Sequence, residues 1–155
     1  FVKGLCAQTA AAYRGLPSSL AAAAGLLQRH PDIGMIGVLN DGRMGDVILS
    51  RYRHISGALK PLEEPAVVSP RDLAADDTCD SFVTLQGDRI LGLLPQAVQE
   101  KTEALSVLDA AHLLDPPGWE WPERGHFAES CEAVYVRPPV FVEPVFPKLQ
   151  EGLKQ

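Results

Sequence analysis

The carboxylates and histidines of this sequence are the first candidates for chemistry, because they can bind metal ions or transfer protons. Asp76, Asp77 and Asp80 stand close together in a polar stretch, and carboxylate oxygens are the ligands that a hard cation prefers. A solvated loop explains the same residues without a cation, and we favour that interpretation. No H-x-x-x-H or H-E-x-x-H pair of the zinc-binding kind occurs. The histidines stand alone, at His30, His54, His112 and His126.

Nucleophilic and cofactor-binding motifs are also lacking. The cysteines, Cys6, Cys79 and Cys131, are widely spaced without a C-x-x-C pair, so we expect reduced thiols rather than a zinc site or a disulfide framework. No G-x-S-x-G elbow and no G-x-x-x-x-G-K-[ST] loop occurs, and "GMIG" lacks the spacing of a dinucleotide fingerprint. We therefore expect no catalytic site, no metal and no cofactor.

Composition and charge are those of a soluble globular protein. The chain has 155 residues, 46% hydrophobic and 22% charged, which suits one domain with a core. A net charge of -6 and a pI near 5.1 argue against direct, tight binding of nucleic acid. The basic stretch Arg51, Arg53 and His54 is typical of a solvated strand edge. No apolar run reaches the length of a membrane span and no signal-peptide pattern opens the chain, so we expect a cytoplasmic protein.

Two helices are expected at the beginning of the chain. Residues 1–12 place apolar side chains on one helical face. A second helix is expected over 18–30, with Ser18 or Ser19 as its N-cap and Pro31 just after its end.

Two apolar runs with a polar turn between them predict a β-hairpin. The run at 33–40 is short and rich in β-branched residues, as in a buried strand. Asn40, Asp41 and Gly42 supply the turn chemistry, and 44–53 is expected to pair back on the first strand.

Prolines divide the rest of the chain into short elements. Pro61, Pro65 and Pro70 exclude a central strand but allow edge strands at 59–62 and 66–68. The other expected elements are a short helix from Ser69 to 75, a strand beginning at 81 and ending in a Gly87–Asp88 turn, a helix over 101–114, a strand at 134–136 and an extended arm at 138–147.

The hairpin also carries a specific resemblance. "DGRMGDV" at 41–47 closely resembles the D-A-R-M-G-E-V-Y signature of the TsaB (YeaZ) family, the non-catalytic partner in bacterial synthesis of threonylcarbamoyladenosine on tRNA. The sequence departs from this signature at three positions, with Gly42 in place of the family's Ala, Asp46 in place of its Glu and Ile48 in place of its Tyr. Four other segments are similar to family segments in the same order: "VKGL" at 2–5, "GLPSSLAA" at 15–22, "PAVVSPRDL" at 65–73 and "AVYVRPP" at 133–139.

The resemblance implies a fold class. The family is α/β and similar to actin, Hsp70 and the sugar kinases, a ribonuclease H-like fold with two related subdomains. The family's N-terminal segment, with its G-P-G-S-F-T-G motif, has no match here, so the chain is expected to be mostly the second subdomain. The expected parts are helices from the end of the first subdomain and a linker at 1–30, the second α/β subdomain at 31–137, and a proline-rich arm at 138–155.

The resemblance also implies a function without catalysis. Proteins of this family are scaffolds for a glycoprotease-like catalytic paralogue and its ATPase partner, so we expect the same partners here. Self-association is expected as well, through apolar surface that the unmatched subdomain would otherwise cover. The alternatives are a glycoprotease-type peptidase, whose H-x-x-x-H pair this sequence lacks, and a truncated interaction module with a different partner.

The candidate site is the hairpin itself, as a structural element or a partner contact. It comprises Asp41, Gly42, Arg43, Met44, Gly45 and Asp46. Asp41 suits a turn, its side chain bonding to nearby backbone N–H groups, while Gly42 and Gly45 permit positive φ. Arg43 is expected to pair with an acid or, alternatively, to contact a partner.

Overall fold

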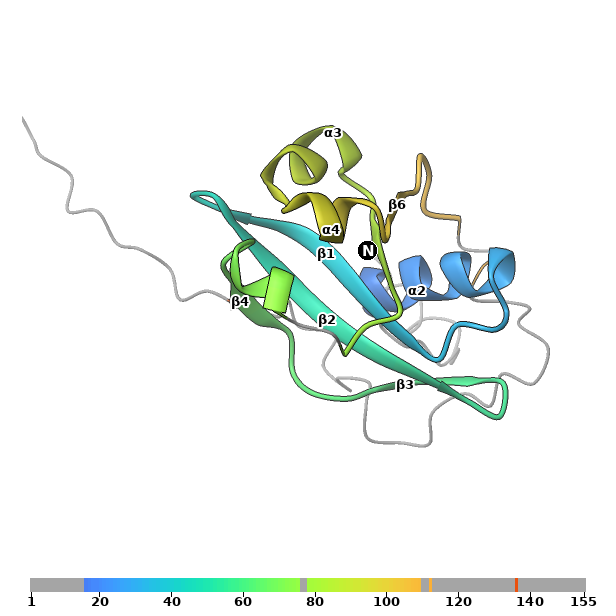
Figure 1. The fold of residues 1–155 in the computed structure, drawn as a ribbon. Helices are drawn as coiled ribbons and strands as arrows, with labels where there is room; N and C mark the ends of the chain where they lie inside the picture. The colour runs from blue at the N-terminus through green and yellow to red at the C-terminus, as the bar shows by residue number, and fades with distance from the viewer. Residues whose placement is uncertain (1–15, 76–77, 110–111, 113–135, 137–155) are drawn as a thin grey trace, which may run out of the picture.

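The computed structural model describes residues 16–75, 78–109, 112 and 136, and they form a mixed α/β fold around one six-stranded sheet (Figure 1). The strand order is β3-β2-β1-β5-β6, and β4 also pairs with β2. The elements are α2 (Ser18–Arg29), β1 (Met35–Arg43), β2 (Asp46–Ile55), β3 (Ala58–Pro61), β4 (Ala66–Val68), η1 (Asp72–Ala75), β5 (Ser81–Thr84), α3 (Gly87–Ile90), η2 (Leu91–Leu93), α4 (Gln96–Gln99) and β6 (Thr102–Ala104).

Strand direction divides the sheet into two parts. β1, β2, β3 and β4 pair antiparallel, whereas β1 pairs parallel to β5 and β5 parallel to β6. A parallel pair needs a crossover connection, and α3, η2 and α4 lie within the segment that joins β5 to β6. The carboxyl ends of β1, β5 and β6 therefore lie at the same edge of the sheet.

The sheet is buried on both faces. Along β1, Ile36 and Val38 belong to a core shared with α2, while Leu39 belongs to a core shared with α3 and α4. All three side chains are fully buried. A central strand covered on both faces accounts for the nearly continuous apolar run in the sequence.

The helix α2 begins without the expected serine cap. Pro17 occupies the N-cap position, and no side chain caps the helix. Instead, the hydroxyls of Ser19 and Tyr52 lie 2.8 Å apart in a buried hydrogen bond between α2 and β2. Burial raises the pKa of Tyr52, an effect that the hydrogen bond with Ser19 partly opposes. The prediction of Ser18 or Ser19 as N-cap was wrong, because the helix already begins at Ser18 and the hydroxyl of Ser19 bonds to Tyr52.

The hairpin is present, but its turn lies later than predicted. Asn40 and Asp41 were expected in the turn, yet both pair within the ladder, opposite Ile48 and Val47. The two residues between the strands are Met44 and Gly45. Asn40 and Asp41 are residue types that favour turns, but here they lie inside β1 because its pairing with β2 continues past them.

The expected helix over 101–114 is wrong from 101 to 109, where the structure has no helix. Thr102–Ala104 is the strand β6, which pairs with β5. The apolar spacing was misleading, since Leu105 is buried whereas Leu108 is 39% exposed. The expected Gly87–Asp88 turn is the beginning of α3 instead.

The edge strands are confirmed as β3 and β4. The short helix is present as the 3-10 helix η1, but it begins at Asp72 and not directly after Ser69. The expected helix at 1–12 and the arm at 138–147 lie outside the described residues, as does the strand at 134–136 apart from Val136. The division of the chain at 30 and 137 stays a prediction.

Candidate functional site

The tip of the β1–β2 hairpin has a left-handed backbone at three successive residues. Arg43, Met44 and Gly45 have φ values of 62°, 56° and 86°. Because Arg43 pairs with Asp46, Met44 and Gly45 form a two-residue loop. Positive φ at both loop residues is the requirement of a type I′ turn, whose twist suits a hairpin and whose first position favours Asn, Asp or Gly. Methionine is an unusual choice for that position.

A β-bulge lies just before the tip. Asp41 pairs with Val47 and Arg43 with Asp46, so β1 has one residue more than β2 at this point. That residue is Gly42, where an added Cβ would lie 2.9 Å from the carbonyl oxygen of Asp46. Gly42 does not have the expected positive φ; of the two glycines, only Gly45 does. Glycine at 42 instead permits a close approach of the two strands.

Three contacts hold Asp41 at the base of the hairpin. Its Oδ1 accepts a hydrogen bond from the backbone N–H of Arg43 at 2.8 Å, as the sequence predicted. Its own N–H donates to Oε1 of Gln86 at 2.7 Å. Its Oδ2 lies 3.4 Å from the guanidinium of Arg89. The bulge is therefore fixed both within the strand and from the segment that follows β5.

The sequence analysis missed Gln86 and Arg89. They follow β5, which pairs parallel to β1 with Leu39 opposite Thr84. This register places residues just beyond Thr84 beside Asp41. The only signal that could have identified them is the strand order of the sheet.

The side chains at the tip point away from the protein core. Met44 is 86% exposed, the largest value among the exposed apolar side chains of the described residues. Arg43 is exposed too. Among the described residues it makes no ion pair, so the expected acidic partner is not found there. A left-handed conformation costs a residue other than glycine about 1–2 kcal/mol, and no packing of Met44 offsets this cost.

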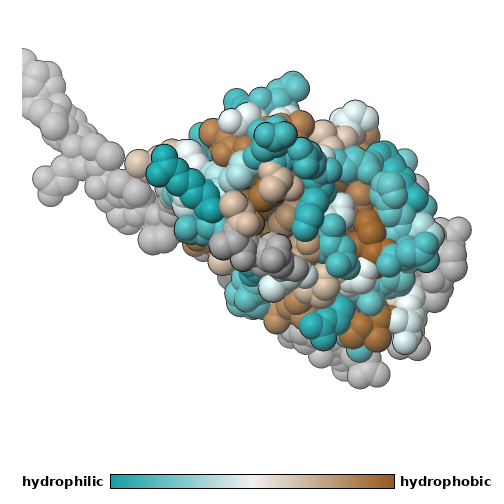
Figure 2. Space-filling model, in the orientation of Figure 1, coloured by the Kyte–Doolittle hydropathy of each residue, from teal (hydrophilic) through white to brown (hydrophobic). Residues whose placement is uncertain are grey.

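The surroundings of the tip are mostly polar. In Figure 1 the hairpin tip projects past α3 and β4, at the opposite end of β2 from β3. Figure 2 shows hydrophobic residues on the same face in separate small groups among hydrophilic ones.

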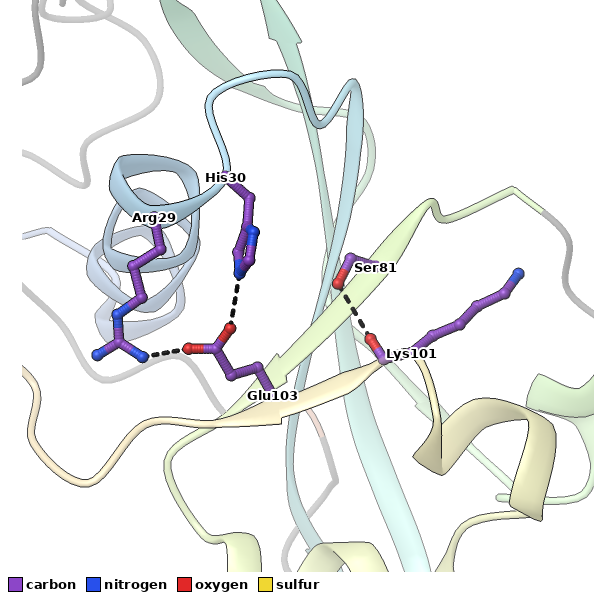
Figure 3. Close-up of polar contacts among 5 residues, drawn as sticks. All are labelled: Arg29, His30, Ser81, Lys101 and Glu103. Atoms are coloured by element: carbon purple, nitrogen blue, oxygen red, sulfur yellow. Dashed lines mark hydrogen bonds and ion pairs between the residues drawn. The ribbon is translucent and has the colours of Figure 1, made fainter.

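A second polar cluster joins α2 to β6 (Figure 3). His30 Nε2 lies 2.9 Å from Glu103 Oε2, and Arg29 forms an ion pair with the other carboxylate oxygen. Burial acts to raise the pKa of Glu103, but the hydrogen bonds from His30 and Arg29 outweigh it and the pKa is lowered. Both ends of the Arg29–Glu103 pair are partly exposed, so its contribution to stability is small.

Two other candidates for chemistry, Asp80 and His54, have structural partners. Asp80 Oδ2 accepts hydrogen bonds from the backbone N–H groups of Gly34 and Met35, at 3.0 and 2.8 Å. His54 Nδ1 lies 3.2 Å from the carbonyl oxygen of Ile33. Within the described part of the chain, no three metal-ligating side chains form a group. Asp76, Asp77, His126, Cys6 and Cys131 lie outside the described residues.

Two solved structures resemble this fold. An "uncharacterized protein with similarity to peptidase YEAZ from Pseudomonas aeruginosa" matches 88% of the chain with a TM-score of 0.63 and 21% identity. "YeaZ from Pseudomonas aeruginosa" matches 73% of the chain with a TM-score of 0.56 and 18% identity. The chain has a YeaZ-like fold.

The YeaZ-like similarity covers only part of each neighbour. The chain spans 64% of the first structure and 53% of the second. No protein-family model matches the sequence, and no curated protein matches it. Among the described residues, no helix has both the length and the hydropathy of a membrane span.

Proposed function

We propose that this chain is a non-catalytic scaffold of the TsaB (YeaZ) type, supporting a glycoprotease-like paralogue and its ATPase partner in threonylcarbamoyladenosine modification of tRNA. One observation carries the proposal: the segment that resembles the family signature, residues 41–47, forms an exposed hairpin tip on a YeaZ-like fold. A signature that served only core packing would be buried. Residues 43–45 are exposed instead, which supports a contact role.

Charge supports an indirect role in tRNA modification. Affinity for tRNA depends on clustered Lys and Arg that neutralise phosphates. This chain has a net charge of -6, so its contribution is protein binding, while the partners supply the contacts to tRNA. We further propose a cytoplasmic location, where tRNA is modified.

Reconstitution tests the proposal. The full-length gene product, the glycoprotease-like subunit and the ATPase partner of the same organism are purified and combined with tRNA, threonine, bicarbonate and ATP. We expect a stable complex of the first two proteins and formation of modified nucleoside that depends on this chain. Modification of equal rate without this chain, together with no binding, would overturn the scaffold role.

The second candidate function is a glycoprotease-type peptidase, and it is favoured by the structural likeness to a protein that is itself described as similar to a peptidase. The same preparation distinguishes the two functions. A peptidase cleaves a protein or peptide substrate in the absence of the paralogue and of tRNA. The scaffold proposal predicts no such cleavage at any protein concentration that supports tRNA modification.

A further inference from the structure

We draw no further inference here: the strongest candidate, the open pocket at the carboxyl ends of β5 and β6 that Gln86, Arg89 and Ser106 line, carries nothing, because Gln86 and Arg89 already belong to the site described above and nothing in the structure shows what covers the rest.

Discussion

The two hairpin tips at opposite ends of β2 have similar φ values at their two loop residues and different chemistry. Each has two loop residues with positive φ, Met44–Gly45 at one end and Ser56–Gly57 at the other. Serine is small and polar, as an exposed turn residue should be. Met44 is large, apolar and 86% exposed. The turn itself therefore does not require methionine.

The tips also differ at their bases. β2 and β3 pair without a register shift, whereas the β1–β2 ladder has a bulge that begins at Asp41. Only the bulged hairpin has a residue beside its loop, Arg43, with positive φ as well. The β2–β3 tip therefore only connects two strands, whereas the shape of the β1–β2 tip is fixed by additional contacts.

Gly42→Ala should have the largest effect on stability. The new Cβ would meet the backbone of Asp46 at 2.9 Å, so the bulge must open, and we expect a loss of about 2 kcal/mol in the free energy of unfolding. Urea denaturation measures it, with Gly92→Ala as the control because a Cβ there has no neighbour within 4 Å. The TsaB (YeaZ) signature that residues 41–47 resemble has alanine at this place, and an unchanged stability would show that the bulge accepts alanine without strain.

Asp41→Ala should have the next largest effect. It removes the acceptor for the N–H of Arg43 and the partner of Arg89, and we expect a loss of about 1.5 kcal/mol. Asp41→Asn keeps an acceptor oxygen and should lose about half as much. Amide exchange should increase at the β1–β2 tip and not at the β2–β3 tip; equal increases at both would contradict a local role for Asp41.

Met44→Asn should stabilise the protein, by about 1 kcal/mol, because asparagine adopts the left-handed conformation more readily. The reciprocal change, Ser56→Met, should destabilise it by about the same amount. Thermal denaturation of both variants measures the strain directly. A lower Tm for Met44→Asn would mean that the methionine stabilises the fold, and the contrast between the two tips would be lost.

Glu103→Gln should have the smallest effect, about 0.5 kcal/mol, since its partners are exposed. The contribution also has a defined pH dependence. The folded-state pKa of Glu103 is lower than the unfolded one, so the stabilisation is complete above the unfolded value and is lost as pH falls through the folded value. The difference between parent and variant in urea denaturation should therefore disappear in acid; a constant difference down to pH 2 would contradict the ion pair.

Local chemistry made part of the fold predictable. The missing N–H of proline limited 59–62 and 66–68 to edge positions, and β3 and β4 lie there. The strand β6 could not be predicted in the same way. Its three residues have no strand pattern of their own, and they are extended because β5 offers them a partner 20 residues away in the sequence, as between Phe82 and Thr102.

The candidate site, too, could be predicted from the sequence only in part. The tip residues are contiguous, so a sequence signature could identify them. The left-handed conformation of Met44 could not be predicted, because Asn40, Asp41 and Gly42 are better turn formers and attracted the turn assignment. Gln86 and Arg89 reach Asp41 only through the order of strands in the sheet.

Site-specific photocrosslinking tests the central contrast between the two tips most directly. A benzophenone amino acid is placed at position 44 or at position 56 of the full-length protein, which is then irradiated with the glycoprotease-like subunit. We predict that position 44 crosslinks to the subunit and that position 56, which has a similar φ value, does not. Equal crosslinking at both positions, or none at 44 in a complex that has formed, would contradict a contact role for the β1–β2 tip.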